Sequence, residues 1–394
     1  MEVYNKSLEM HKEKKGKFEI CSKIELKNQE DLSLAYTPGV AAPCKEIAAD
    51  KERVYDYTGK GNLVAVVTDG SAVLGLGNIG PEAGLPVMEG KCILFKEFAG
   101  IDAIPICLNT QDTDKIIETI LNISPGFGGI NLEDISAPRC FEIEERLVEQ
   151  LDIPVFHDDQ HGTAIVTLAA LINAFRVSGK KKETAKVVIN GAGSAGMAIG
   201  KLLKAYGFAQ IVLCDSKGII GPQRTDLDRY KRDALTWSNQ TGESGKLKDG
   251  LIGADVFIGV SAANVLSKEM VETMNMDPII FAMANPVPEI MPEDAYLAGA
   301  FIVGTGRSDF DNQINNVLVF PGLFKGALEA RASTIHMGMK LAAAEALADV
   351  IPSSELRSDY IIPNVFNKKV VEAVSEAVRK AAFSDDKMLS DPKE

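Results

Sequence analysis

Residues 186–196 read KVVINGAGSAG, and this stretch decides the fold of the second half of the chain. A short β-branched run leads into glycines spaced as G-x-G-x-x-G, and the residues that follow, MAIGKLLKAYG, are typical of a helix that ends at Gly207. A strand, glycine turn and helix of this kind binds the pyrophosphate of a dinucleotide, because the helix N-terminus faces the phosphates. We therefore expect a dinucleotide to contact the loop residues Gly191, Ala192, Gly193, Ser194, Ala195 and Gly196.

An acid for the cofactor ribose is expected about 20 residues after the glycine loop. The next predicted strand, residues 210–214, places Asp215 directly after its last residue. A carboxylate at this position accepts hydrogen bonds from the 2′-hydroxyl of NAD and repels the 2′-phosphate of NADP. Lys217 could neutralise such a phosphate, with help from Arg232. The sequence therefore leaves NAD and NADP open.

The same glycine spacing occurs a second time, in GLGNIG at residues 75–80. Here Pro81, Gly84 and Pro86 follow the loop, and we expect them not to continue a helix. Small residues allow a close approach of the main chain. We therefore interpret this second match as a backbone loop near a substrate rather than a dinucleotide site.

Short β-branched runs alternate with longer amphipathic runs from about residue 60 onward, which is the pattern of βαβ units and mostly parallel sheets. A length of 394 residues exceeds the size at which one core stops growing, about 250 to 300 residues. We therefore predict an α/β protein of two domains. The predicted strands are residues 63–67, 103–107, 130–132 and 154–156, then 186–190, 210–214, 255–260, 278–283 and 300–303.

The two predicted domains meet at a long apolar segment. Residues 163–178 predict a buried connecting helix that stops at Gly179. We expect a metal- and substrate-binding α/β domain over residues 1–160, completed by C-terminal helices within residues 335–394. A Rossmann-type dinucleotide-binding domain would then occupy residues 161–334.

The composition excludes several classes of function. A net charge of -13 disfavours nucleic-acid binding, which needs a basic face. No apolar stretch approaches the roughly 18 residues of a membrane span, and the N-terminus is polar. The six cysteines are scattered without a Cys-x-x-Cys pair, as expected in a reducing compartment. We therefore expect a cytoplasmic protein without a membrane or nucleic-acid partner.

Two acidic pairs follow neighbouring predicted strands. Glu133 and Asp134 come directly after residues 130–132, and Asp158 and Asp159 lie just past residues 154–156. Since the carboxyl ends of parallel strands share one sheet edge, the four acids should converge and repel one another unless a cation holds them. Carboxylate donors favour Mg²⁺ or Mn²⁺ over structural zinc. The alternative is that these acids cap the next helices, which is credible for Asp134.

The stretch FHDDQH at residues 156–161 has the histidine spacing of a zinc-protease signature. That signature requires both imidazoles on one helix face. Here a strand ends at Phe156 and the next helix begins only after Gly162, so His157 and His161 lie in a turn. We therefore interpret the histidines as neighbours of the acids rather than as metal ligands.

Seven stretches over nearly the whole chain resemble one known family, the malic enzymes of the short bacterial type. The combination is highly specific because each stretch carries chemistry. The stretches are LAYTPGVA (34–41), VVTDGSAVLGLGNIGPEAGLPVMEGK (66–91), NLEDISAP (131–138), FHDDQHGTA (156–164), GAGSAG (191–196), FAMANPVPE (281–289) and GTGRSDFDNQINN (304–316).

The resemblance implies roles for the acids and the dinucleotide loop. Glu133, Asp134 and Asp159 would bind the metal, and Asp158 would act beside them as an acid/base or supporting group. The family oxidises L-malate and decarboxylates it to pyruvate, so the expected cofactors are NAD or NADP and Mg²⁺ or Mn²⁺. Such a metal would stabilise the charge that develops as CO₂ leaves.

The resemblance also implies the remaining catalytic and substrate residues. Tyr36 matches the general acid of the family, and Lys91 matches its partner and base, which requires that burial and the metal lower the pKa of Lys91. Asn285, Asn315 and Asn316 match amides that contact the substrate carboxylate and the nicotinamide side.

One position departs from the long-form relatives. They carry an arginine just before the glycine loop that pairs with a substrate carboxylate, and Ala72 stands at the aligned position here. Recognition of that carboxylate must then come from other groups. Ser71 with loop amides, or Arg307, are the candidates.

We therefore expect oxidative decarboxylation of L-malate by a homodimer or higher homo-oligomer. Two other activities stay open: malolactic conversion of malate to lactate, and nicotinamide binding by a catalytically silent regulator. The sequence does not decide allosteric effectors, the physiological direction, or whether a partner subunit completes the active site.

Overall fold

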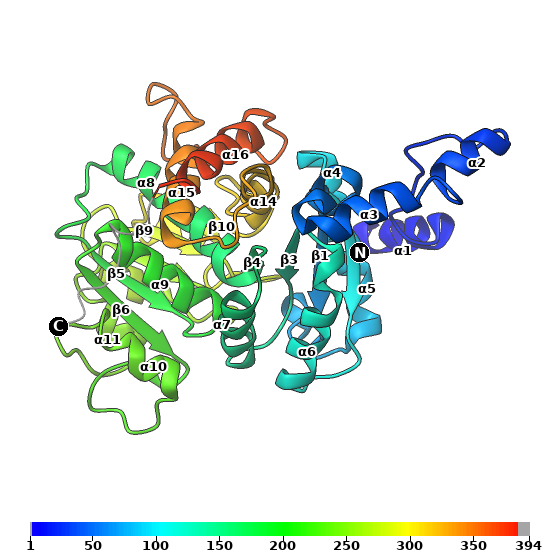
Figure 1. The fold of residues 1–394 in the computed structure, drawn as a ribbon. Coiled ribbons are helices and arrows are strands. Elements are labelled where there is room, and N and C mark those ends of the chain that lie inside the picture. The colour runs from blue at the N-terminus through cyan, green and yellow to red at the C-terminus, as the bar shows by residue number, and fades with distance from the viewer. Residues whose placement is uncertain (1, 385–394) are drawn as a thin grey trace.

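The computed structural model describes residues 2–384, which form two largely parallel sheets (Figure 1). The first sheet has the strand order β2-β1-β3-β4 and the second the order β10-β9-β8-β5-β6-β7. Every strand pairing is parallel except the short pairing of β6 with β7. The prediction of an α/β protein with mostly parallel sheets is confirmed.

The first sheet belongs to the first half of the chain and is covered by helices on both faces. Its central strand β1 is buried from its second residue onward, as expected for a strand between two helical layers. The strands and helices are β1 (Leu63–Thr68), α5 (Pro81–Ala99), β2 (Asp102–Cys107), α6 (Thr113–Ile123), β3 (Gly129–Leu132), α7 (Arg139–Gln150) and β4 (Val155–His157).

Helix α5 corrects one prediction, because it begins at Pro81, directly after the GLGNIG loop, and continues through Gly84 and Pro86. Pro81 is the first residue of the helix, where no backbone hydrogen bond is lost. Pro86 removes only one internal bond. The apolar face that includes Met88 and Phe95 is fully buried, and this burial outweighs the missing bond.

The second sheet contains the predicted dinucleotide unit. The predicted strand 186–190 is confirmed as β5, and α9 ends at Gly207, whose φ of 104° suits only glycine. The strands are β5 (Lys186–Asn190), β6 (Gln210–Asp215), β7 (Gly218–Ile219), β8 (Val256–Gly259), β9 (Ile279–Ala282) and β10 (Ile302–Thr305). The helices between them are α9 (Ser194–Tyr206), α10 (Arg229–Ala234), α11 (Leu247–Leu251), α12 (Lys268–Glu272) and α13 (Pro292–Leu297).

Helix α8 (Thr163–Ser178) connects the two sheets, and Gly179 ends it as predicted. Every residue from Ala164 to Ala174 is buried. The side chain of Asn173 donates hydrogen bonds to the carbonyls of Ala348 and Ile361, which fixes the C-terminal segment to this helix. Within residues 2–384, no helix combines the length and apolar character that would let it cross a membrane.

Three C-terminal helices fill the space between the sheets: α14 (Phe320–Glu329), α15 (Met337–Asp349) and α16 (Lys369–Ala381) (Figure 1). A loop over residues 330–336 separates α14 from α15. Phe320 and Phe324 of α14 make edge contacts with Phe95 of α5, at ring centroid distances of 4.8 and 5.3 Å. The end of the chain thus packs against the first half, and residues 385–394 lie outside the described residues.

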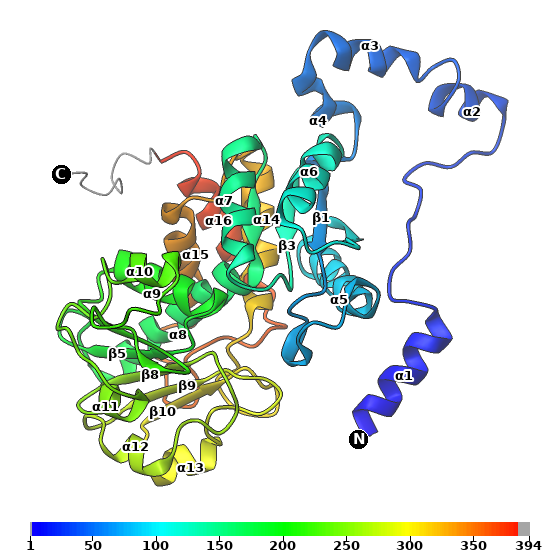
Figure 2. The ribbon, with the colours of Figure 1, turned by 90° about the horizontal axis from the view of Figure 1, so that it is seen from below.

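The N-terminal arm, α1 (Glu2–Lys14), α2 (Gln29–Ala35) and α3 (Ala41–Ala49), extends away from the rest of the chain (Figure 2). No residue from 3 to 50 is buried. The arm nevertheless carries large apolar side chains such as Ile20 and Leu34, which are 83% and 71% exposed. A short helix, α4 (Val54–Tyr57), leads from the arm into the first sheet.

Candidate active site

A cavity of about 530 Å³ lies where the carboxyl ends of the two sheets face each other. Ligands of parallel α/β sheets bind at this edge. The cavity brings together predicted residues from distant parts of the sequence. Its lining includes Gly75, Lys91, Glu133, Asp134, Asp159, Ser194, Ala195, Asn285, Asn315 and Asn316.

The acid cluster consists of Glu133, Asp134 and Asp159. Each offers one carboxylate oxygen, and these oxygens lie within 4.8 Å of one another. Pairing of β3 with β4 sets Leu132 beside His157, so that the acids that follow the two strands meet. Asp134 has a left-handed backbone with φ of 55°, and its amide donates to the Asp159 carboxylate at 2.8 Å. The convergence predicted from the sequence is confirmed.

Lys91 lies on α5 against the acid cluster. Its Nζ is 2.9 Å from a Glu133 oxygen and 2.6 Å from an Asp158 oxygen, and it stands 4.2 Å from the ring centroid of Phe320. Burial alone would lower the pKa of Lys91, but the carboxylates of Asp158 and Glu133 outweigh burial and raise it. Without a bound cation, Lys91 therefore does not have the lowered pKa that a general base needs.

Asp158 lies behind the cavity rather than in its wall and is fully buried. One of its oxygens accepts hydrogen bonds from Lys91 at 2.6 Å and from the amide of Asn316 at 2.5 Å. Burial raises the pKa of Asp158 to about 7. A Cβ atom at Gly162 would overlap the other Asp158 oxygen, so only glycine fits there. Asp158 thus links Lys91 to the asparagine that follows β10.

The site has the composition of a hard-cation site. Four carboxylates face a single ammonium, and burial together with mutual repulsion raises the pKa of both Glu133 and Asp159. A divalent cation would supply the missing positive charge, and the donors on offer are all oxygens. The residues present therefore fit Mg²⁺ or Mn²⁺.

The acidic turn (Asp158–Gly162) is one π-helical turn between β4 and α8. His157 ends β4, whereas His161 points away from the acid cluster and contacts Glu144 of α7 at 2.8 Å. Glu144 also accepts hydrogen bonds from the His157 amide at 3.1 Å and from the Gln160 side chain at 3.1 Å. The two histidines do not share a helix face, and the turn is held from behind by an acid that the sequence pattern did not reveal.

The dinucleotide loop has the geometry that its glycines predict. Gly191 has φ of 119°, and a Cβ atom there would lie 2.5 Å from the carbonyl oxygen of Val260. A Cβ at Gly196 would overlap the carbonyl oxygen of Gly191. These close approaches set Ser194 at the N-terminus of α9, where its backbone lines the cavity and can face an anion.

Asp215 ends β6 at the edge where the adenosine ribose is expected, but it is already paired. Its oxygens lie 2.6 Å from Arg224 and 2.9 Å from Lys231. Burial raises the pKa of Asp215, but hydrogen bonds from Arg224 and Lys231 outweigh burial and bring it to about 2. Lys217 instead pairs with Asp226 at 2.6 Å, and Arg232 is not part of this group.

Comparison with known proteins adds the family. The model for the malic enzyme N-terminal domain matches residues 15–148, and the model for the malic enzyme NAD binding domain matches residues 160–383. The chain belongs to the malic enzyme family.

Individual malic enzymes are similar over nearly the whole chain. A bifunctional malic/malolactic enzyme of Bacillus subtilis is 60% identical over 397 residues, which cover 100% of this chain and 97% of that protein. An NADP-dependent malic enzyme of Rhizobium meliloti is 49% identical over 96% of this chain and 52% of its own length. The crystal structure of an NAD-dependent malic enzyme from Thermotoga maritima has a TM-score of 0.92 at 52% identity, covering 94% of this chain and 98% of that one.

In this malic enzyme chain, Tyr36 lies far from the cavity that holds the acid cluster. It follows α2 on the N-terminal arm, is 67% exposed, and does not line the cavity. One copy of the chain therefore brings Lys91 to the acids but does not bring Tyr36 to them.

Ser71 is committed to the protein framework. Its hydroxyl donates to Asp69 at 2.5 Å and accepts from Arg139 at 3.0 Å. Arg139 also pairs with the buried Asp69 at 2.8 Å. Arg307 pairs with Asp309 at 2.6 Å outside the cavity lining, whereas Ala72 does line the cavity. The two expected replacements for the missing arginine are thus occupied by other partners.

The asparagine side of the cavity is held by a residue that the sequence analysis missed. Glu289 is fully buried, and its carboxylate accepts hydrogen bonds from the amides of Ser261 and Ala284, both at 3.0 Å. Both amides belong to residues of the cavity wall. A Cβ at Gly75 would lie 2.5 Å from the Asn285 carbonyl oxygen, so the GLGNIG loop does border the cavity as predicted.

Proposed function

We propose that this malic enzyme catalyses the oxidative decarboxylation of L-malate to pyruvate and CO₂, with reduction of NAD or NADP and with Mg²⁺ or Mn²⁺ as a required ion. One observation carries the proposal. A single cavity of about 530 Å³ joins the acid cluster and Lys91 to the N-terminus of α9, so a small hydroxy acid and a nicotinamide can meet in it.

Glu133, Asp134 and Asp159 are the proposed metal ligands. A divalent ion held there would act as a Lewis acid on the substrate oxygens and stabilise negative charge during decarboxylation. The nicotinamide would accept the hydride from C2 of malate. Both groups are supported by the buried acids and by the dinucleotide loop that opens into the same cavity.

Lys91 is the proposed base for the malate hydroxyl proton. In the free chain, its Nζ is held by Glu133 and Asp158, which keep it charged. Once Glu133 is committed to a cation, one of the two carboxylates that raise the pKa of Lys91 is neutralised, and the amine can lose its proton more easily. Asp158 then orients Lys91 and Asn316 rather than touching the substrate.

Asn285, Asn315 and Asn316 are the proposed contacts for the substrate carboxylate and the nicotinamide amide. All three line the cavity on the side of the second sheet. Neutral amide donors bind a carboxylate without the charge of the arginine that Ala72 replaces.

We further propose that the enzyme is a homodimer in which Tyr36 reaches the cavity of the partner subunit as general acid. The arm that carries Tyr36 exposes several large apolar side chains, such as Ile20 and Leu34, and exposed apolar patches mark protein interfaces. Mixing inactive Tyr36→Phe protein with inactive Asp159→Ala protein should restore activity, because a mixed dimer contains one intact site. Absence of restored activity in a mixture shown to exchange subunits would contradict this arrangement.

The decisive test of the reaction measures initial rates of NAD(P)H formation with malate and Mn²⁺, first with NAD and then with NADP. Net reduction with equal pyruvate formation is the expected result. Both cofactors have a suitable group near Asp215. Its carboxylate can accept hydrogen bonds from the ribose diol of NAD, and its partners Arg224 and Lys231 can bind the 2′-phosphate of NADP. Nucleotide binding without turnover would instead support the silent regulator.

A second activity has one specific observation in its favour. The similar Bacillus subtilis protein is named a bifunctional malic/malolactic enzyme. A malolactic reaction would yield lactate from malate without net formation of NADH. Measuring lactate and pyruvate in the same reaction separates the two activities.

We also retain the division into residues 1–160 with the C-terminal helices and residues 161–334 as a proposal. Helix α14 falls within residues 161–334, and its packing against α5 is a contact between the two proposed domains. All six cysteines are free, which fits a reducing compartment such as the cytoplasm.

A further inference from the structure

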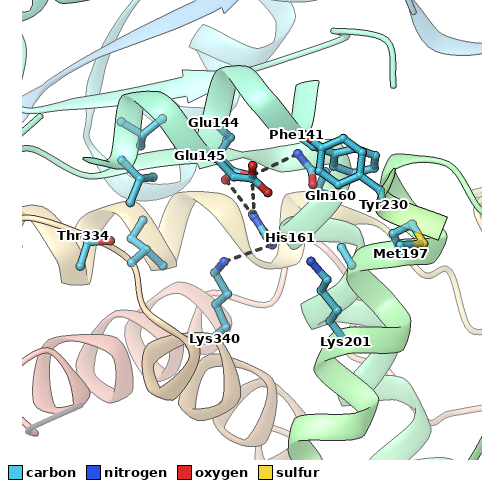
Figure 3. Close-up of a pocket in the computed structure, with 14 residues that line it drawn as sticks. Phe141, Glu144, Glu145, Gln160, His161, Met197, Lys201, Tyr230, Thr334 and Lys340 are labelled. Carbon is cyan, nitrogen blue, oxygen red and sulfur yellow. Dashed lines mark hydrogen bonds and ion pairs between the residues drawn. The ribbon is translucent and has the colours of Figure 1, made fainter. Parts of the chain in front are cut away.

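Figure 3 shows a second cavity, which Gln160 and His161 of the acidic turn line, whereas Asp159 of the same turn lines the active-site cavity. The second cavity has a volume of about 250 Å³, and it shares no lining residue with the active-site cavity. It forms where α7, α9, α10 and the start of α15 meet, so both halves of the chain contribute to its wall. We call it the side cavity.

The side cavity contains two ammonium groups. Lys201 of α9 and Lys340 of α15 point toward the same space beside His161 (Figure 3). Lys340 donates to Nδ1 of His161 at 3.1 Å, and neither lysine forms an ion pair with a carboxylate of residues 2–384. Burial lowers the pKa of Lys340 to about 8, although Glu144 opposes this shift. The two lysines thus reach a cavity that Glu144 and Glu145 also line, without an ion pair to either carboxylate.

The two carboxylates of the cavity lining have other hydrogen-bond partners or lie at the surface. Glu144 is committed to His161 and to the Gln160 side chain, at 2.8 and 3.1 Å. Glu145 also lines the cavity, but it is an exposed residue of α7. Lys201 is exposed and Lys340 is partly exposed, so an anion that enters here can accept a charge-assisted hydrogen bond from each ammonium group.

Apolar and aromatic side chains form much of the remaining wall of the side cavity. The rings of Phe141 of α7 and Tyr230 of α10 are tilted by 49° with centroids 4.6 Å apart, and Val148, Met197 and Ile335 also line the cavity. Binding sites for small molecules combine such a wall with a few placed polar groups. The occupant should therefore have an anionic end and an apolar body.

We propose that the side cavity binds a small amphipathic carboxylate, with its carboxylate between Lys201 and Lys340 and its apolar part against Phe141 and Tyr230. This site is separate from the one proposed for malate. The binding claim does not depend on the proposed reaction, because it rests on residues that the active site does not use.

Isothermal titration with phenylacetate tests the proposal, because this probe has one carboxylate and one apolar ring. We expect measurable binding to the full chain and about tenfold weaker binding to Lys201→Gln, which corresponds to the loss of one charge-assisted hydrogen bond. Lys201→Arg should retain binding. Lys204→Gln, in the same helix but outside the cavity lining, is the matched control and should bind as the unaltered chain does.

Three outcomes would overturn the proposal. The first is equal phenylacetate affinity in the unaltered chain, Lys201→Gln and Lys340→Gln. The second is competition between malate and phenylacetate at one fixed, saturating Mn²⁺ concentration without nucleotide, which would place the probe in the active site. The third is equal affinity for inorganic phosphate, which would mean that the aromatic wall contributes nothing. If malate fails to bind while phenylacetate still binds, the proposed reaction fails and the side cavity stands.

The side cavity shares the acidic turn with the proposed metal site, which suggests a coupling that does rest on the proposed function. His161 and Gln160 line the cavity, while Asp158 and Asp159 of the same turn face the other way. An anion that competes for Lys340 withdraws the donor from His161. We expect saturating phenylacetate to change Mn²⁺ affinity at least threefold, and by linkage Mn²⁺ should change phenylacetate affinity equally. Unchanged Mn²⁺ affinity would contradict the coupling but not the binding.

Discussion

The acid cluster and Asp215 are carboxylates in equivalent places, each following a strand of a parallel sheet. Their surroundings differ. Glu133 and Asp159 face other acids, and burial with mutual repulsion raises their pKa. Asp215 faces Arg224 and Lys231, whose hydrogen bonds bring its pKa to about 2 despite burial.

The position of an acid in the fold therefore does not define its role. The acid cluster stores unfavourable electrostatic energy that a bound cation can relieve, so it costs stability and provides binding. Asp215 is already satisfied, so it contributes stability and presents a fixed, paired surface to the cofactor. Neutralising an acid should therefore change the free energy of unfolding in opposite directions at the two sites.

Loss of one acid of the cluster should have the largest effect. We expect Asp159→Ala to lower metal-dependent pyruvate formation by on the order of 10³-fold, because the proposed ion loses one of its three carboxylates. Glu118→Ala, which removes an exposed acid of α6, is the control and should be fully active. Near-normal activity of Asp159→Ala with Mn²⁺ would break the assignment of the cluster.

Removal of Lys91 should separate catalysis from metal binding. We expect Lys91→Ala to lower turnover by about 10²-fold or more, as for the loss of a general base. Mn²⁺ should bind more tightly to this variant, because the ammonium that competes for Glu133 is gone. Calorimetric titration with Mn²⁺ measures this, and weaker Mn²⁺ binding would mean that Lys91 supports the ion instead of competing with it.

Neutralising an acid should change stability in opposite directions at the two sites. In the presence of a chelator, Glu133→Gln should raise the free energy of unfolding by on the order of 1 kcal/mol, because one buried repulsion disappears. Asp215→Asn should lower it by about 1–2 kcal/mol, because two ion pairs lose their acceptor. Denaturant unfolding of both variants checks the signs. The same sign for both would remove the electrostatic distinction.

The stability contributed by Asp215 should depend on pH in one direction only. Its pKa is lowered in the folded chain, so the contribution is complete above the ordinary value of 3.8 and fades as pH falls toward about 2. The stability difference between the unaltered chain and Asp215→Asn should therefore be constant near neutral pH and shrink in acid. A difference that grows as pH falls below 3.8 would contradict the pairing.

Local sequence signals predicted the sheets and the convergence of the acids. The strand 186–190, the helix 163–178 with Gly179, and the acids after β3 and β4 all follow from short-range patterns that the structure confirms. These features are encoded by neighbouring residues, through glycine geometry and β-branched runs. The order of parallel strands then brings the acids together without further information.

Long-range charge partners could not be predicted in the same way. Arg224 and Lys231 reach Asp215 from a polar segment that carries no motif, and Glu144 is an acid within an ordinary amphipathic helix. Helix α5 was missed at its start because local propensity counts Pro86 against a helix, while tertiary burial decides in its favour. The N-terminal arm keeps large apolar side chains exposed in a single copy of the chain. A local sequence pattern does not show what covers them.

Helix α8 has a consequence for how such enzymes can be recombined. Its residues from Ala164 to Ala174 are buried, and its main packing partners, α9 and α15, lie in the same family-model region, so a gene fusion made between the two regions would leave the helix covered. A nucleotide-binding module could be exchanged between relatives only together with α8 and the C-terminal helices that pack on it. A smaller exchange that cuts between α8 and these helices would uncover the apolar helix, so changes of cofactor preference below that scale should be made by point substitution around β6.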